Sequence, residues 1–222
     1  MSKLVIFGAG DIARLAHFYF RTDSPHQVAA FVVDAAFKNE DTFDGLPLVS
    51  FEEALDRYPP SHHEAFVAIS YAQMNRLRRA KYEQMRGAGY RCVTYLSSRC
   101  TYLTTPPGEN CFILEDNTVQ PFVTIGNNVT LWSGNHIGHH SRVNDNCFIS
   151  SHVVVSGFCE IGRNSFLGVN ATLANNVSLG EDTWLGPNVT ITGSTEPNQL
   201  FGAVQAQPAK VPAKRFFKVR ES

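Results

Sequence analysis

The chain has 222 residues, 43% of them apolar, with a formal net charge of −1 and five cysteines. This length suits one or two compact domains, and the balanced charge argues against nucleic acid or an anionic membrane surface as a partner. No apolar run approaches the roughly 20 residues that cross a bilayer, and no basic and apolar leader follows Met1. The cysteines lack CxxC spacing, which argues against a disulfide framework or a zinc knuckle. We therefore expect a cytoplasmic protein.

The first hundred residues alternate strand-like and helix-like segments. Gly8 and Gly10 follow the first strand in GxGxxA spacing, and Asp34 ends the second strand. Such a turn lets a pyrophosphate approach the backbone at a helix N-terminus, and the acid can accept from a ribose hydroxyl. A tight turn that holds no ligand is the alternative. We expect strands over residues 3–7, 28–33, 64–70 and 91–96 and helices over residues 14–20 and 74–87.

This first unit, which we place at residues 1–105, is too short for a complete dinucleotide-binding fold. The segment Pro106-Pro107-Gly108 ends it before a second mononucleotide half can form. We therefore expect a truncated Rossmann-like domain and no hydride transfer.

A six-residue period runs through the second half of the chain. Every sixth residue from Ile113 to Ile191 is Ile, Leu or Val, which makes fourteen positions in one register. Neither the helical period of 3.6 residues nor the strand period of 2 accounts for this spacing. The residue two before each aliphatic lies on the same side of a short strand, so each repeat points two side chains inward.

A third column marks corners in the chain. Three residues after each aliphatic stand residue types that tolerate a positive φ. Phe122 and Phe158 are exceptions, which either strain or a local change of turn must accommodate. Short strands joined by regular corners predict a solenoid that buries its apolar columns by stacking coil on coil. The corner residues of the expected type are Asn128, Gly134, His140, Asn146, His152, Asn164, Asn170, Asn176, Asp182 and Asn188.

This pattern resembles the hexapeptide-repeat acyltransferases over about residues 113–191. The resemblance implies a left-handed parallel β-helix with three six-residue faces, which we place at residues 106–200, and a homotrimer that binds acetyl-CoA in grooves between subunits. The expected fold is a short Rossmann-like N-terminal domain followed by this left-handed parallel β-helix, with a basic C-terminal tail at residues 201–222.

The combination of the two units is similar to a narrower family, the acetyltransferases of nucleotide-linked amino sugars and their sialic acid O-acetyltransferase relatives. In that family the N-terminal unit holds the nucleotide sugar. The resemblance implies that the substrate is contacted by Gly10, Asp11, Ile12 and Asp34. The chain departs from the family at Asp11 and Ile12, where relatives carry small residues or His. Because an acid repels a pyrophosphate, the identity of the nucleotide stays open.

Acyl transfer from a thioester needs a base for the nucleophile and a hydrogen-bond donor for the thioester oxygen. His139 lies two residues after Ile137, where the backbone does not require a histidine. Gly157 follows by eighteen residues, so we expect it one coil away, roughly 5 Å along the axis, with its N–H open to a ligand. The family resemblance likewise assigns the base to His139 and the thioester contact to Gly157.

The resemblance bears on three further residues, His140, Val169 and Lys210. The family often places an acid after the catalytic histidine, but here His140 stands there and supplies no negative charge. Val169 matches a position whose backbone meets the pantetheine. Lys210 belongs to a Pro-Ala-Lys segment that resembles the one closing many of these enzymes, and it could meet CoA phosphates. A solvated tail is the alternative. The basic residues of the tail are Lys210, Lys214, Arg215, Lys218 and Arg220.

Other histidines have simpler interpretations. His136 points outward on a flat face, which suits a surface or interface residue, and backbone geometry alone can explain His152 and His140 in the corner column. A second class of hexapeptide solenoids binds zinc through three histidines, but their ligand spacing is not reproduced here. We expect no metal.

Three aromatic residues are spaced by eighteen and point outward on one face: Phe148, Phe166 and Trp184. An exposed aromatic ladder on a soluble protein is normally covered. We expect a neighbouring subunit to cover it, with the C-terminal tail as the alternative.

We therefore predict a homotrimeric acetyltransferase that moves an acetyl group from acetyl-CoA to an amino sugar carried on a nucleotide, in cell-surface polysaccharide or glycan biosynthesis. Acetylation of a sugar hydroxyl is the nearest alternative, since the same base would serve. A non-catalytic scaffold that binds a nucleotide sugar is the alternative from another class.

Overall fold

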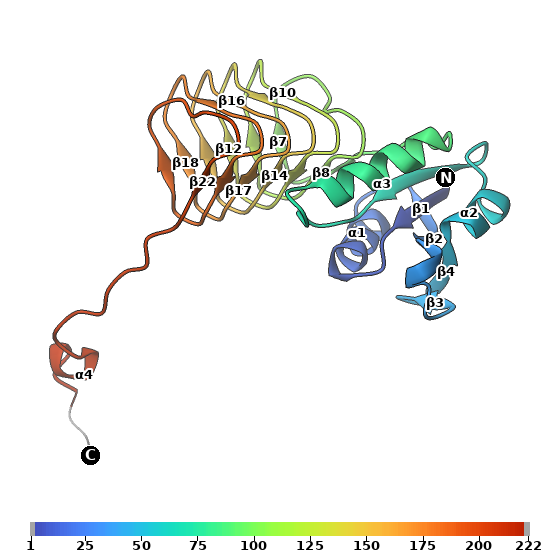
Figure 1. Cartoon of the computed structure of the whole chain (residues 1–222), viewed down its shortest axis with the longest axis horizontal. Helices are drawn as coiled ribbons and strands as arrows, with labels where there is room; N and C mark the ends of the chain where they lie inside the picture. The colour runs from blue at the N-terminus through green and yellow to red at the C-terminus, as the bar shows by residue number, and fades with distance from the viewer. Residues whose placement is uncertain (1–2, 220–222) are drawn as a thin grey trace.

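The structure, a computed structural model, describes residues 3–219 and comprises an N-terminal α/β unit, a solenoid and a C-terminal arm (Figure 1). In the N-terminal unit the strand order is β3-β4-β2-β1-β5; β3 is antiparallel to β4, and the other pairs are parallel. The strands are β1 (Lys3–Phe7), β2 (Gln27–Val33), β3 (Thr42–Phe43), β4 (Leu46–Ser50) and β5 (His63–Val67). The helical segments are α1 (Asp11–Thr22), the 3-10 turn η1 (Ala35–Phe37), α2 (Phe51–Arg57) and α3 (Arg76–Gly87).

Helices cover both faces of this sheet. On one face α1 buries Ala13 and Phe20, while Ala54 of α2 and Met85 of α3 are buried on the other. A parallel sheet covered on both faces needs strands that are apolar throughout, which explains the continuous apolar runs of β1 and β2.

The solenoid is a parallel β-helix with three strands per coil. Its strands form three sheets, in the orders β10-β13-β16-β19, β22-β20-β17-β14-β11-β8-β6 and β21-β18-β15-β12-β9-β7. Successive coils pair at a spacing of eighteen residues, as in Thr130 with Phe148 and His136 with Val154, which confirms the predicted winding. The strands are β6 (Tyr95–Leu96), β7 (Thr101–Tyr102), β8 (Phe112–Ile113), β9 (Thr118–Val119), β10 (Thr124–Ile125), β11 (Thr130–Leu131), β12 (His136–Ile137), β13 (Arg142–Val143), β14 (Phe148–Ile149), β15 (Val154–Val155), β16 (Glu160–Ile161), β17 (Phe166–Leu167), β18 (Thr172–Leu173), β19 (Ser178–Leu179), β20 (Trp184–Leu185), β21 (Thr190–Ile191) and β22 (Leu200–Phe201).

The expected fourth strand of the N-terminal unit, at residues 91–96, is wrong. Cys92 makes only an isolated bridge to Ala65, and β6 pairs with β8 in the solenoid instead. β7 pairs with β9 in the same way, so the solenoid begins ahead of the expected boundary between residues 105 and 106. In this first coil paired residues lie seventeen apart instead of eighteen, as in Leu96 with Ile113. That shift removes the coil from the six-residue register.

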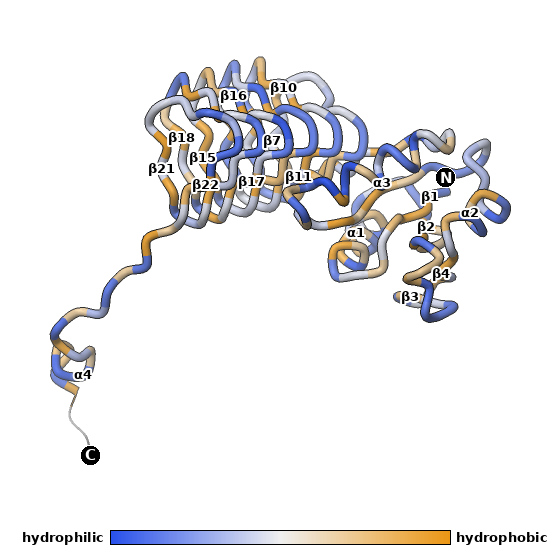
Figure 2. The backbone as a smooth tube through the Cα atoms, in the orientation of Figure 1, coloured by the Kyte–Doolittle hydropathy of each residue, from blue (hydrophilic) through white to orange (hydrophobic). Residues whose placement is uncertain are grey.

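The interior and the corners follow the sequence pattern. None of the fourteen aliphatic residues in the register is more than 6% exposed, and Figure 2 shows hydrophobic and hydrophilic stretches alternating along the coils. The corner residues have positive φ, for example 55° at Asn128 and 58° at His140. Phe122 and Phe158 keep the same corner, with φ of 66° and 59°, so strain accommodates them.

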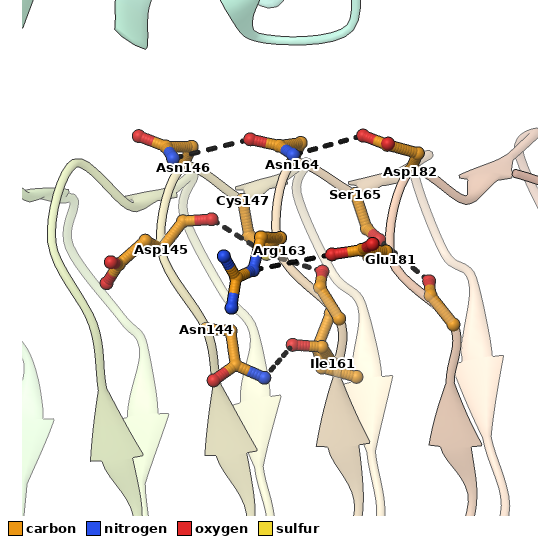
Figure 3. A network of polar contacts seen from close by, with 12 residues as sticks. Asn144, Asp145, Asn146, Cys147, Ile161, Arg163, Asn164, Ser165, Glu181 and Asp182 are labelled. Carbon is orange, nitrogen blue, oxygen red and sulfur yellow. Dashed lines mark hydrogen bonds and ion pairs between the residues drawn. The ribbon is translucent and has the colours of Figure 1, made fainter. Parts of the chain in front are cut away.

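The corners align into three edges. One of them, here called the asparagine edge, carries a row of side-chain hydrogen bonds between successive coils, with distances of 2.8–3.3 Å. Figure 3 shows part of this row. The edge that contains His140 is called the aromatic edge. The asparagine edge consists of Asn110, Asn128, Asn146, Asn164 and Asp182. The aromatic edge consists of Phe122, His140, Phe158 and Asn176.

Arg78 of α3 fastens the N-terminal unit to the asparagine edge. Its side chain is only 2% exposed, and its guanidinium donates to the carbonyl oxygens of Asn128 (3.2 Å), Asn146 (3.0 Å) and Cys147 (3.2 Å). It also donates to Oδ1 of Asn75 (3.0 Å). These acceptors are neutral, so the guanidinium is held by oriented dipoles rather than by a carboxylate.

The aromatic ladder of Phe148, Phe166 and Trp184 is covered from within the same chain. Tyr71, in the loop after β5, contacts all three rings, with centroid distances of 5.1, 4.7 and 5.8 Å. The guanidinium of Arg78 lies 5.6 Å from the centroid of Phe148. The expectation of a neighbouring subunit as the main cover is therefore wrong, because docking of the N-terminal unit already buries Phe148 and Phe166.

The C-terminal arm leaves the solenoid after β22 and leads away from the body of the molecule to a short helix, α4 (Ala213–Phe216) (Figure 1). Arg220 lies outside the described residues. Within residues 3–219, no helix has the length and apolar character that a membrane crossing requires.

Candidate active site

The structure brings His139 and Gly157 together on successive coils of the aromatic edge. His139 follows β12 and precedes the corner at His140, and its side chain is exposed. A Cβ added to Gly157 would lie 2.8 Å from Cε1 and 3.0 Å from Nε2 of His139. The imidazole therefore occupies space that only a glycine leaves open.

The N–H of Gly157 is not open to a ligand, contrary to the expectation. It donates to Oδ1 of Asn175, one coil further on, at 2.9 Å. The same kind of contact occurs on the asparagine edge, where the backbone N–H of Asn127 donates to Oδ1 of Asp145. In both places a side chain on the next coil accepts a hydrogen bond from the backbone N–H of the residue before a corner. Gly157 could serve as an oxyanion donor only after Asn175 has turned away.

His140 contacts His139 directly. Their Nδ1 atoms lie 3.1 Å apart, and the two rings are perpendicular, with an interplanar angle of 89°. One of these nitrogens must carry the proton and the other must accept it. If Nδ1 of His139 is the donor, its Nε2 keeps a lone pair and can take a proton from a nucleophile. The backbone N–H of His139 donates to Oε1 of Gln120 at 2.9 Å.

Replacing Gly157 with alanine is expected to lower the turnover number about 10–100-fold, because the new Cβ displaces the imidazole of His139 from its position. The backbone φ of Gly157 lies outside the left-handed region, so the variant folds and keeps its melting temperature. Gly193→Ala is the control, since a Cβ there meets nothing within 4 Å. Steady-state kinetics measure the effect, and an unchanged turnover number would show that the imidazole needs no fixed position.

The glycine turn of the N-terminal unit has one sterically required glycine. Gly8 has a φ of 132°, and a Cβ there would lie 2.7 Å from the carbonyl oxygen of Ala68. Gly10, which precedes α1, is exposed, and a Cβ there would meet nothing within 4 Å. The backbone at Gly10 is thus open to a ligand at the N-terminus of α1.

The neighbouring substrate candidates already have partners in the chain. Asp11 is the first residue of α1, where a carboxylate is favoured by the helix dipole and competes with a phosphate. Ile12 is partly buried and packs against the core beneath α1. Asp34 accepts from Nζ of Lys81 at 2.6 Å. A ribose hydroxyl at Asp34 must therefore share or displace this lysine.

One chain does not bring the glycine turn to His139. The N-terminal unit docks on the asparagine edge through Asn75 and Arg78, which contact the carbonyl oxygens of Asn164 and Asn146. His139 stands on the aromatic edge, two corners further along each coil. Within one chain, the N-terminal unit that carries the glycine turn therefore docks at a different edge of the solenoid from the one that carries His139.

The expected CoA contacts are also apart from His139 within one chain. Val169 is 43% exposed and precedes the corner at Asn170, on the third edge. Lys210 is exposed on the arm, which leads away from the solenoid.

The remaining histidines stand where the pattern predicted. His136 is half-buried on β12, and His152 is an exposed corner residue with a φ of 58°. Among residues 3–219, no three or more His, Cys, Asp or Glu side chains are arranged to hold a metal ion.

Two contacts of the site were missed at the level of sequence. Phe158 lies against the imidazole of His139, with a centroid distance of 5.1 Å, and Asn175 holds the N–H of Gly157. The eighteen-residue spacing could have found Asn175. A phenylalanine in a column of asparagines was the signal for Phe158.

The hexapeptide pattern is also recognised at the level of sequence families. Residues 122–157 match the family described as bacterial transferase hexapeptide (six repeats). No curated protein sequence matches the chain.

Solved structures of acetyltransferases share the whole fold. A variant of perosamine N-acetyltransferase from Caulobacter crescentus, in complex with CoA and GDP-perosamine, is 23% identical, with a TM-score of 0.79 over 93% of this chain and 96% of that chain. PerB from Caulobacter crescentus, in complex with CoA and GDP-perosamine, is 24% identical, with a TM-score of 0.79 over 93% and 97%. The acetyltransferase domain of PglB from Neisseria gonorrhoeae FA1090 is 18% identical, with a TM-score of 0.79 over 94% and 100%. The chain thus has a Rossmann-like unit followed by a left-handed parallel β-helix.

Proposed function

We propose that this protein transfers the acetyl group of acetyl-CoA to the amine of a sugar carried on a nucleotide. The observation that carries the proposal is the imidazole of His139, exposed and seated over the side-chain-free Gly157. The hexapeptide match at residues 122–157 and the shared fold support it. The similar structures contain CoA with GDP-perosamine, or acetyl coenzyme A, which fits these two substrates.

The reaction is direct attack on the thioester. The amine nitrogen bonds to the thioester carbonyl carbon, and an electron pair moves to the carbonyl oxygen. Nε2 of His139 takes the proton from the nitrogen. When the tetrahedral intermediate collapses, the carbon–sulfur bond breaks and His139 returns the proton to the sulfur of CoA. The N–H of Gly157 stabilises the oxyanion once Asn175 has released it.

The complete site is proposed to form between copies of the chain in a homotrimer. Because the N-terminal unit with the glycine turn docks at the asparagine edge while His139 stands on the aromatic edge, a neighbouring copy supplies the missing half. In this assembly the nucleotide sugar contacts the substrate residues of one unit, while CoA lies between solenoids and contacts Val169 and Lys210. The substrate residues are Gly10, Asp11, Ile12 and Asp34.

A scaffold that binds the nucleotide sugar without catalysis is the second candidate. The hydrogen bond from Gly157 to Asn175 favours it, since this bond occupies the expected oxyanion donor. Acetylation of a hydroxyl uses the same base and differs only in the product.

The proposal is tested by the release of free thiol from acetyl-CoA in the presence of UDP-, dTDP- and GDP-linked amino sugars. We expect release that depends on one class of nucleotide sugar, and a rise in melting temperature with that sugar, because ligands of the folded state stabilise it. A rise in melting temperature without thiol release would identify the scaffold. Neither effect with any sugar would contradict both functions.

A further inference from the structure

The two phenylalanines of the aromatic edge are held at a cost in free energy. Phe122 and Phe158 have φ of 66° and 59°, in the left-handed region that bulky side chains avoid. Their side chains are 69% and 55% exposed, so burial does not offset the strain. Asn176 on the same edge has the residue type that this backbone favours. Strain of this kind often marks a site where the side chain itself has a task.

The two phenylalanines contact the ring of His140 from the coils on either side of it. Phe122, His140 and Phe158 stand on three successive coils, with His140 in the middle. The His140 ring lies 4.6 Å from the Phe122 ring at an interplanar angle of 37°, and 4.8 Å from the Phe158 ring at 15°. Two aromatic neighbours on opposite sides restrict the rotation of the imidazole.

His140, whose ring lies between the two phenylalanines, forms a hydrogen bond with the proposed base, His139. Nδ1 of His140 lies 3.1 Å from Nδ1 of His139, and the Phe158 ring also packs edge-on against His139, at 5.1 Å and 88°. Small rotations of an unheld His140 would break this hydrogen bond, because its geometry depends on ring orientation.

We propose that Phe122 and Phe158 are positioning residues that clamp His140 as the acceptor of the Nδ1–H of His139. This clamp fixes the tautomer of His139 that leaves Nε2 free to take a proton. The inference rests on the proposed function, since it assigns the orientation of the same base. It gives this chain a neutral His–His pair in which ring stacking does the orienting.

The test uses Phe122→Asn, Phe158→Asn and the double variant. Asparagine suits the left-handed backbone, so these variants keep or raise the melting temperature. We expect the turnover number of the double variant to fall about tenfold, with the KM values of both substrates changed less than about twofold. In a long-range ¹H–¹⁵N spectrum of neutral imidazoles, His139 in the double variant is expected to show both tautomers, whereas the native chain shows the Nδ1–H form alone.

Two further variants separate positioning from folding. Phe158→Tyr keeps the ring and is expected to keep both the turnover number and the tautomer. His152→Asn makes the same kind of change at a left-handed corner of another edge and is expected to alter neither.

Each outcome bears on the clamp. An unchanged tautomer in the double variant overturns it, as does a raised KM with an unchanged turnover number, which would make the rings a binding surface. The spectrum needs no turnover, so a native chain without transferase activity would contradict the proposed function and still leave the clamp tested.

Discussion

The His139→Asn variant is expected to lose about 10²–10⁴-fold in turnover number, which is the usual contribution of a general base. Asparagine can still form a hydrogen bond, but it cannot take the proton of the attacking amine. The side chain of His139 is exposed, so its replacement leaves the core untouched and the melting temperature unchanged. Thiol release from acetyl-CoA, measured at saturating concentrations of both substrates, gives the turnover number.

The matched control is His152→Asn, an exposed corner histidine on the edge away from His139. It is expected to retain the native turnover number. If the turnover number of His139→Asn equals that of His152→Asn, then the imidazole of His139 does not act as the base.

Replacing Arg78 with alanine is expected to lower the free energy of unfolding by about 3–5 kcal/mol, because buried carbonyl groups lose a charged donor and a cavity opens. Burial lowers the pKa of Arg78 to about 10, so the guanidinium remains charged at neutral pH. Truncation removes every hydrogen bond from Arg78 to the carbonyls of Asn128, Asn146 and Cys147. Urea denaturation at a fixed protein concentration measures the change.

Arg79→Ala is the comparison for this prediction, since the neighbouring arginine is exposed and pairs with Glu83 four residues along the helix. Such surface pairs contribute little, and we expect a change within about 0.5 kcal/mol. Equal losses in the two variants would mean that the buried guanidinium does not hold the two units together.

The solenoid could be predicted because its contacts repeat at a fixed distance along the sequence. From β8 to β21 each coil packs on residues eighteen positions away, so the aliphatic register, the corners and the contact of His139 with Gly157 all follow from counting. The first coil was not predicted, because its paired residues lie seventeen positions apart. With one residue fewer than the repeat, β6 and β7 fall outside the six-residue register, so the solenoid was expected to begin later than it does.

Contacts between the two units could not be predicted in this way. Tyr71 and Arg78 reach the solenoid from the loop after β5 and from α3, and no periodic rule links them to Phe148. The hydrogen bond that Asn175 accepts from Gly157 does follow the eighteen-residue rule. The absence of a side chain at Gly157 leaves space for the imidazole of His139, but the backbone N–H is still within reach of the Asn175 side chain on the next coil.

The central claim is that the imidazole of His139 removes the proton from a sugar amine as that amine takes the acetyl group. Its most direct test is the acetylated product itself, identified by mass and NMR after incubating acetyl-CoA and a nucleotide-linked amino sugar with the native chain or with His139→Asn. The account predicts an amide on the sugar nitrogen with the native chain and at least about 100-fold less of it, in the same time, with the variant. An ester on a sugar oxygen, or equal amounts of amide from both chains, would contradict it.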